Sequence, residues 1–526
     1  MKSVFREHCF QTYDFLKLND IAYSFILDQS EYHMNSLLRK ASELLLCATI
    51  LSVASTVNDT SVTQWDSVFA LGKSGNATVP NAVRHPDLSA IGDESNDYAW
   101  DGHYWLRAYA IMAQVTGNTK YVDWGFELID TMFYHTDRNR YNRGEIGIPT
   151  YGQASLDVAR RAWCRANPTD TLCKGLTAAD SNAVGVGWRC LNSGEWYYAT
   201  LNDGMTTQGM LHFLATVLTD SRFASYSTRA YADITKIERV VKERLPSYGK
   251  SLWADSLGRN VSGSFYYIRE DQPFADILWG EAKWKFYTNP VPYNHSAAFV
   301  GSLLLLDSLQ GHAHPEYREI ADSLLQYLKN YIRTVNYANQ DTSYEWNYEP
   351  KEGGSNAGVE DVGHAHGDLS FLQIAKASGI KGLTDHDMKL FTQSFHRIYK
   401  SDSTVTEKLD GTGTHTSEGN FEIGNDWLDL IPWDTTLYGL GKAVFHKNFN
   451  SIWSRPMLMW ANLIRWNQIL ATKATPTTII NEPQSPVLRS TKHVEGNWRL
   501  NGERIASPQN NGVYLGSDGN LHAKAQ

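Results

Sequence analysis

Apolar residues recur at helical spacing through most of the chain, from about residue 95 to 475. An apolar segment from Arg107 to Thr116 ends at Gly117, and the helical period resumes from Tyr121 to Phe133 after a short polar turn. The same plan recurs over 210–243, 297–332 and 371–399, and a last helix is expected over 457–470. The pattern therefore predicts an all-α main domain built from antiparallel helix hairpins.

Helix hairpins that follow one another in this way stack side by side, and the stack either closes or stays open. A closed stack is an (α/α)n toroid, or barrel, of about six or seven pairs whose inner helices form the wall. Loops that join the pairs at one end of such a toroid line a cleft. We expect the toroid; an open solenoid fits the same pattern, because one sequence does not reveal closure.

Two long segments, 138–203 and 248–292, are rich in Gly, Asn, Asp and Tyr and lack the helical period. Irregular loops of this length within a compact domain commonly act as lids or cleft walls. The tail, residues 476–526, begins as a linker rich in Thr, Pro, Asn and Ser. Its last part, 498–515, has an Asn-Gly and Gly-x-Tyr pattern that resembles the sorting segments of type IX secretion, which would make the secretion machinery a partner. A small β hairpin without a sorting role explains the same residues.

The region after Met34 has the layout of a signal peptide. Arg39 and Lys40 precede an apolar run over 44–54 that ends in small residues and is too short to span a bilayer comfortably. We expect residues 1–33 to be an upstream extension, 34–59 a signal peptide and 60–475 the helical domain. The protein is then secreted, periplasmic or on the cell surface, with no membrane span after cleavage. A buried helix in an intracellular protein is the alternative.

Composition and charge narrow the classes of partner. The net charge of -9 argues against a general nucleic-acid binder, which needs a basic field, and the chain has no P-loop, dinucleotide fingerprint or HExxH zinc motif. Its 17 Trp and 28 Tyr suit a protein that stacks aromatic rings on sugars, although a large helical core also uses aromatic residues. An acidic polysaccharide would need locally placed cations instead.

Three cysteines remain after the expected signal cleavage, namely Cys164, Cys173 and Cys190. Export makes a disulfide plausible, and Cys164 and Cys173 are the closest pair in sequence, but three cysteines cannot all pair within one chain. No CxxC spacing is present, which argues against a zinc site among them.

Four polar clusters stand where predicted inner helices begin or end, and a toroid would place its cleft there. They are 96–105 (NDYAWDGHYW), 292–296 (PYNHS), 344–348 (YEWNY) and 360–368 (EDVGHAHGD). The order of Pro-Tyr-Asn-His, Tyr-x-Trp-x-Tyr and Glu-Asp-x-x-His resembles the α/α-toroid polysaccharide lyases that act on uronic-acid polymers, especially polysaccharide lyase family 38. The resemblance covers roughly residues 85–470 and implies cleavage of alginate or glucuronan.

Such a lyase removes the proton on C5 of a uronate and expels the oxygen on C4, so the uronate carboxylate must be neutralised and a base must be present. We assign the neutralisation to Asn294 and His295 and the roles of base and acid to Tyr348, while His364 shares either role. Related lyases often place an Arg beside the Tyr; 342–348 contains none, so Arg143 or Arg269 would have to replace it. The residues expected to bind substrate are Trp100, His103, Trp105, Arg143, Arg269, Tyr293, Tyr344, Trp346, Glu360 and Asp361.

Each cluster also has a purely structural interpretation. His295 would cap a helix that begins near Ser296, and Tyr344 and Tyr348 would form a packed helix face. His364, His366 and Asp368 suggest a metal site, but alternate residues on a helix point apart, so neither a metal nor another cofactor is expected.

Two other functions compete with the lyase. A glycoside hydrolase would use an acid and a base drawn from the carboxylates at Asp101, Glu360, Asp361, Asp426 and Asp434. A glycan-binding surface protein without catalysis would keep the aromatic residues and tolerate the loss of His295 and Tyr348.

Overall fold

The computed structural model describes residues 65–70, 97–145, 169, 186–188, 190–192, 195–197, 199–247, 291–337, 341–350, 358–416, 418–449 and 452–474, together with four short strands between 497 and 524. The described residues are mostly helical, which confirms the predicted class. The expected upstream extension and signal peptide, Cys164, Cys173 and Arg269 lie outside this part of the chain. None of the helices within it is long and apolar enough to cross a membrane.

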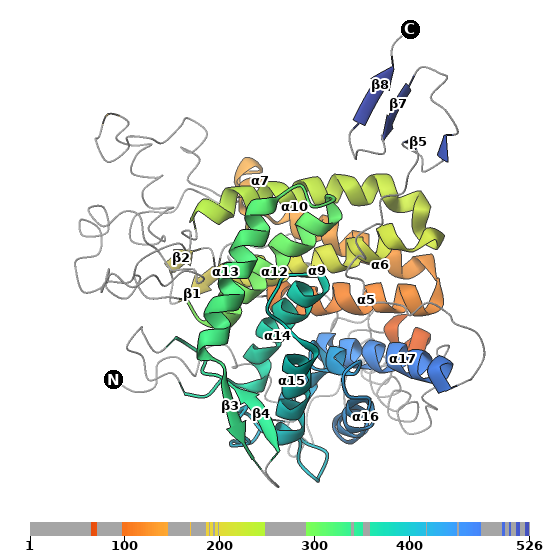
Figure 1. Ribbon diagram of the computed structural model, residues 1–526. Helices are drawn as coiled ribbons and strands as arrows, with labels where there is room; N and C mark the ends of the chain where they lie inside the picture. The colour runs from red at the N-terminus through yellow and green to blue at the C-terminus, as the bar shows by residue number, and fades with distance from the viewer. Residues whose placement is uncertain are drawn as a thin grey trace, which may run out of the picture. The chain divides into compact units, whose positions relative to one another are not determined.

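Long helices follow one another as five consecutive pairs in the described part of the chain (Figure 1). The pairs are α5 (His103–Thr116) and α6 (Thr119–Tyr134), α9 (Thr200–Thr219) and α10 (Ser227–Ser247), α12 (Tyr293–Leu309) and α13 (Pro315–Tyr331), α14 (Val362–Ala377) and α15 (Asp385–Ile398), and α16 (Thr436–Asn448) and α17 (Ser454–Ala474). The helices predicted in these segments are therefore present, and α16 is an element that the sequence interpretation missed.

Local sequence sets the boundaries of these helices. Gly117 ends α5 in the left-handed conformation, at φ 70°, which a residue with a Cβ adopts only with strain. Asn118 then begins α6 by accepting a hydrogen bond from the Lys120 amide. Thr384 and Asp387 form a reciprocal capping box at the start of α15.

Burial divides the helices into two kinds. Every residue of α9 from Thr200 to Leu211 is buried, and α12 is buried almost throughout, as expected of helices surrounded by protein. The partner helix α13 instead buries one face, formed by Tyr317, Ala321, Leu324, Leu325, Tyr327 and Leu328. The first helix of each of the first four pairs is thus largely buried, and in the first three pairs the second helix packs against the first.

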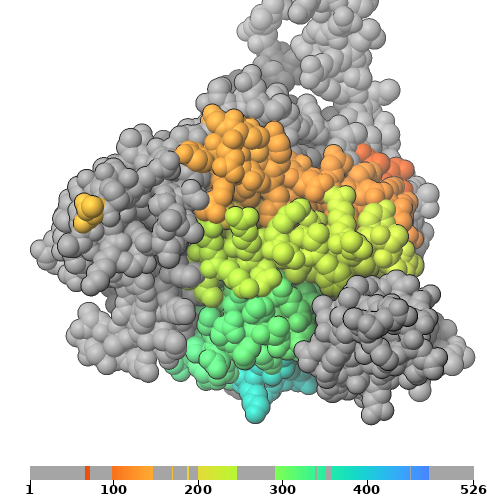
Figure 2. Space-filling model, turned by 90° about the horizontal axis from the view of Figure 1, so that it is seen from above, coloured from red at the N-terminus to blue at the C-terminus, as the bar shows by residue number. Residues whose placement is uncertain are grey.

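The inner helices contact one another in order along the chain. Helix α9 packs against α5 and α12, α12 also packs against α14, and α17 packs against α5. The short helix η7 (Gly419–Gly424) contacts both α14 and α17. Figure 2 shows the segments 97–145, 199–247 and 291–337 as successive bands across one face.

The segment 138–203, which was expected to be irregular, is helical at both of its ends, and most of the second expected loop, 248–292, lies outside the described residues. Residues Asp137–Asn142 form α7, and α9 begins at Thr200, both within the predicted loop 138–203. The helical start of α9 was missed because its first residues are polar, and Asn202, Asp203, Thr206, Thr207 and Gln208 are all buried. Within the same interval β1 (Cys190–Asn192) pairs with β2 (Glu195–Tyr197).

The third polar cluster lies on a strand and the turn after it, not at a helix end as predicted. Strand β3 (Arg333–Asn336) pairs antiparallel with β4 (Thr342–Glu345), with Arg333 opposite Glu345. The interpretation of Tyr344 and Tyr348 as one packed helix face is therefore wrong.

The chain tail contains four strands, in agreement with the expected β character. They are β5 (Asn497–Arg499), β6 (Arg504–Ile505), β7 (Gly512–Leu515) and β8 (Leu521–Lys524), arranged antiparallel in the order β6-β5-β7-β8. The sorting role proposed for this segment stays a prediction.

Candidate active site

Four predicted residues from separate parts of the sequence lie close together. Tyr348, which follows β4, packs against His364 at the start of α14, with ring centroids 5.1 Å apart. Trp100 is in the π-helical turn η1 (Tyr98–Gly102). Its ring packs edge-on against the same imidazole, with the ring centroids 5.7 Å apart. His295 is in the first turn of α12, and the charge of His364 contributes to lowering its pKa. We call Trp100, His295, Tyr348 and His364 the aromatic–histidine cluster; all four are partly exposed.

The backbone holds this arrangement in place. The Tyr293 amide donates a hydrogen bond to the Tyr348 carbonyl at 3.4 Å, which ties the start of α12 to the turn after β4. Helix α12 begins at Tyr293, with Pro292 at its N-cap. His295 is therefore inside the helix, and the interpretation of it as a cap is wrong.

Asp361 fixes the orientation of His364. Its carboxylate caps α14 by accepting from the His364 amide at 2.8 Å, and its other oxygen is 2.6 Å from His364 Nδ1. Burial lowers the pKa of His364, but the hydrogen bond and charge of Asp361 outweigh it and leave the pKa raised. Burial likewise raises the pKa of Asp361, and His364 more than reverses the effect. By contrast, burial followed by the charge of His364 lowers the pKa of His295 to about 3, so this imidazole is neutral.

Asn294 lies beside the cluster and is buried at 1% exposure. Neither its Oδ1 nor its Nδ2 has a hydrogen-bond partner among the residues that the structure describes. Gly367 of α14 allows the close approach, since a Cβ built there would lie 3.3 Å from Cβ of Asn294. A buried amide without partners costs about 1–3 kcal/mol, which favours a ligand that would satisfy it.

Two buried carboxyl groups lie behind the cluster. Glu360 is fully buried, accepts one hydrogen bond from the Asp361 amide and leaves Oε2 without a partner. Burial, then the charges of Asp361 and Asp368, raise the pKa of Glu360 well above its usual value. Burial also raises the pKa of Asp368 to about 7, although the Trp346 indole donates to it at 2.8 Å.

Several predicted substrate-binding residues have other roles. Trp105 and Trp346 are each 1% exposed, so the prediction that they offer sugar-stacking faces is wrong. Tyr293 is equally buried and packs against Tyr327 and Tyr331. Neither residue type nor a short motif shows whether a ring is exposed, and these three rings fill the core.

His103, Tyr344 and Arg143 also make contacts of their own. His103 is buried and its Nδ1 hydrogen-bonds the Met205 carbonyl at 2.7 Å. The Tyr344 hydroxyl donates to Asp387 at 2.6 Å. Arg143 pairs with Glu145 and lies 3.6 Å from the centre of the Tyr134 ring, so it does not supply the Arg expected beside Tyr348.

The sequence interpretation missed an arginine that the structure places near the site. Arg455, at the start of α17, pairs with Glu422 and lies over the Tyr104 ring at 5.7 Å. Asp101, next to Trp100 in sequence, accepts a hydrogen bond from Ser454. The adjacent pair Ser454 and Arg455 had no recognisable motif, and only the fold brings it to η1.

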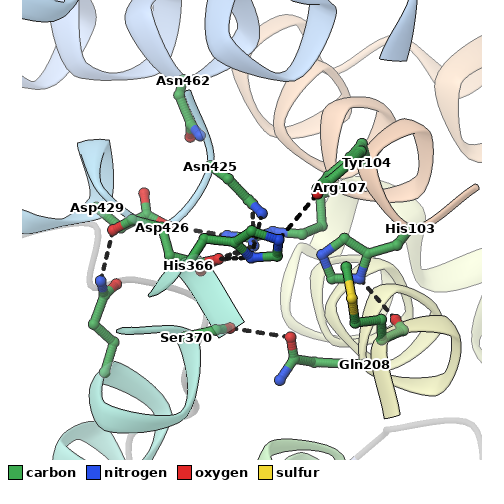
Figure 3. Close-up of polar contacts among 12 residues, drawn as sticks. His103, Tyr104, Arg107, Gln208, His366, Ser370, Asn425, Asp426, Asp429 and Asn462 are labelled. Atoms are coloured by element: carbon green, nitrogen blue, oxygen red, sulfur yellow. Dashed lines mark hydrogen bonds and ion pairs between the residues drawn. The ribbon is translucent and has the colours of Figure 1, made fainter. Parts of the chain in front are cut away.

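A buried polar network lies deeper between the inner helices (Figure 3). Arg107 of α5 donates to Asn425 at 2.5 Å, to both oxygens of Asp426 and to Asp429 at 3.0 Å. His366 of α14 hydrogen-bonds Tyr104 at 3.0 Å and Asn425 at 2.9 Å. The ring of His366 also packs against that of Trp100, with the ring centroids 5.9 Å apart, and this contact connects the network to the aromatic–histidine cluster.

Most of the carboxylates considered for a hydrolase are hydrogen-bonded or ion-paired to other side chains. Burial raises the pKa of Asp426, but Arg107 and His366 reverse this and hold it well below its usual value. Asp434 pairs with His396 at 2.7 Å. Burial raises the pKa of Asp101 and of Glu360, as suits a general acid, and Glu360 is fully buried.

Comparison with known proteins identifies no relatives. No family model, no curated protein and no solved structure matches this chain.

Proposed function

We propose that the protein is a polysaccharide lyase that cleaves a uronic-acid-containing polymer, alginate or glucuronan, by β-elimination. The observation that supports it best is the convergence of Asn294, His295, Tyr348 and His364, which come from three segments of the chain. These are the residue types that the reaction needs: donors for a carboxylate, and a phenol beside imidazoles for proton transfer.

The reaction divides between these residues. The Asn294 amide, which has no partner of its own, and His295 hold the uronate carboxylate and stabilise the charge that develops when C5 loses its proton. Tyr348 takes the C5 proton; the C5 electron pair then forms the C4–C5 double bond as the C4–O bond breaks. Tyr348 returns the proton to the departing oxygen, with His364 held against its ring. Trp100, which is partly exposed, offers an aromatic ring for a neighbouring sugar.

The helix contacts support a closed toroid around this site. Contacts run from α17 through α5, α9 and α12 to α14, and η7 contacts both α14 and α17. We propose that these contacts close the ring, with about six or seven pairs in the whole domain. A closed ring brings the N-terminal ends of α12 and α14 together with η1, which is what the reaction requires.

Export would bring such an enzyme to an extracellular polymer. We propose that residues 34–59 direct secretion, and Edman sequencing of the protein recovered outside the cell tests this. A mature N-terminus near residue 60 supports export, whereas an intact N-terminus on intracellular protein contradicts it.

The test is elimination activity in a pair of tyrosine variants. Lyase cleavage creates a C4–C5 double bond that absorbs in the ultraviolet, so absorbance is followed with alginate, glucuronan and glycosaminoglycans. Tyr348→Phe should lower the rate by about 10²–10⁴-fold, because it removes the proton-transfer group. Tyr344→Phe is the matched control, since that hydroxyl bonds Asp387 outside the cluster. Equal rates for Tyr348→Phe and the parent would remove Tyr348 from the mechanism.

A hydrolase is the second candidate, favoured by the raised pKa of Glu360. In that case Glu360→Gln would abolish cleavage, and the products would show no ultraviolet absorbance.

A further inference from the structure

Three side chains at the start of α14 bring together atoms of the kinds that bind metal ions. Glu360, Asp361 and His364 each place one potential ligand atom within 4.8 Å of the other two. We propose that these residues form a binding site for a divalent cation. The sequence pattern had suggested His364, His366 and Asp368 instead, and His366 turns to Tyr104 in the buried network.

The helix cap brings the three ligands together. Asp361 is the N-cap and His364 is three residues later, so both side chains lie over the first turn, with the His364 Nδ1 and Asp361 Oδ2 atoms 2.6 Å apart. Glu360 precedes the cap, and its Oε1 accepts from the Asp361 amide at 2.9 Å. A cation would take the place of the proton that now joins Asp361 and His364.

The second observation is an oxygen that lacks a partner. Glu360 is 0% exposed, and within the described part of the chain its Oε2 has no hydrogen-bond partner. A buried carboxylate in this state is costly unless it takes up a proton or a cation. Arg455 is already paired with Glu422. Among the described residues, the basic side chain that contacts Asp361 is His364.

The ligand set indicates the kind of cation. Two carboxylates and one imidazole suit Zn²⁺ or Mn²⁺, whereas Ca²⁺ prefers oxygen ligands alone. Three protein ligands leave coordination positions open for a substrate oxygen. If the proposed lyase function holds, the cation would assist Asn294 and His295 in neutralising the uronate carboxylate, at the position where an Arg was expected.

Isothermal titration calorimetry of the metal-stripped full chain with Zn²⁺ and with Mn²⁺ tests the site. The parent should bind one equivalent, and Glu360→Gln and His364→Gln should each weaken binding by at least about tenfold. Asp434→Asn is the matched control, because Asp434 also pairs with a histidine, at 2.7 Å, and is outside the three-residue group. Circular dichroism establishes that each variant is folded.

Saturable binding that is weakened by both ligand variants and kept by the control supports the proposal. Absence of binding at millimolar cation, or binding that both ligand variants retain, overturns it. The absorbance assay is run separately, so a protein that binds the cation and shows no elimination contradicts the lyase function and leaves the site standing.

Discussion

The aromatic–histidine cluster and the buried network are neighbouring polar regions that meet at Trp100, yet their hydrogen bonding differs. In the network, the Arg107 guanidinium has three side chains as partners, and His366 is held by Tyr104 and Asn425. Beside the cluster, the Asn294 amide has no partner and Glu360 leaves one oxygen unpaired. Paired groups stabilise a fold, whereas unpaired groups next to exposed rings favour a ligand.

The largest expected effect comes from breaking the network. Arg107→Met leaves Asp426 and Asp429 buried without their shared cation and should lower the free energy of unfolding by about 3–5 kcal/mol at neutral pH. Urea denaturation measures it. Arg222→Met, which breaks an exposed pair with Asp220, is the control and should cost about 1 kcal/mol or less. Similar losses for the two variants would show that the network is not a stabilising centre.

The same network determines the acid side of the stability profile. Because Arg107 holds the pKa of Asp426 below its unfolded value, the stability that this carboxylate contributes is present above about pH 4 and is lost as the pH falls.

Asp368, behind the cluster, should show the opposite dependence. Burial raises its pKa from 3.8 to about 7, so the folded state binds a proton that the unfolded state releases. Stability should therefore fall as the pH rises from about 4 to about 7, and Asp368→Asn should weaken this dependence, leaving the part that comes from the raised pKa of Glu360. Denaturation of parent and variant across that range measures it, and parallel curves for the two proteins would contradict the assignment.

Asn294→Leu should separate function from stability. Replacing an amide that has no partner by an apolar group of similar size should leave the free energy of unfolding unchanged or raise it by about 1 kcal/mol. Elimination should nevertheless fall at least about tenfold, because a carboxylate donor is lost. Asn425→Leu, in the network, should instead destabilise the protein. A stabilised Asn294→Leu variant with full activity would show that this amide has no part in the reaction.

Trp100→Ala should give the smallest effect. Loss of a stacking ring is worth about 1 kcal/mol, so KM should rise severalfold while kcat changes little. Trp433→Ala, whose indole donates to Asp385, is the control and should leave both constants unchanged. An unchanged KM for Trp100→Ala would remove Trp100 from the substrate site.

The helical pattern of apolar residues was enough to predict most of the fold and part of the site. Periodicity located the helices around Arg107, Leu304 and Leu324 because their apolar faces are continuous. It missed the start of α9, where buried polar residues such as Asp203 and Thr207 replace apolar ones.

At the site, local motifs identified His295, Tyr348 and His364, which the fold brings together. They did not distinguish Trp100, which is partly exposed, from the buried Trp105 and Trp346, because burial depends on contacts between distant segments. Arg455 was missed for the same reason: its position beside Tyr104 follows from the packing of α17 on α5.

Mass spectrometry of the products tests the central claim most directly. Purified protein is incubated with alginate and with glucuronan, and the new chain ends are weighed. The account predicts oligosaccharides whose non-reducing end is one water lighter than a hydrolysis product, formed by the parent and lost in Tyr348→Phe. Products that carry the full mass of added water, or no cleavage of either polymer, would contradict it.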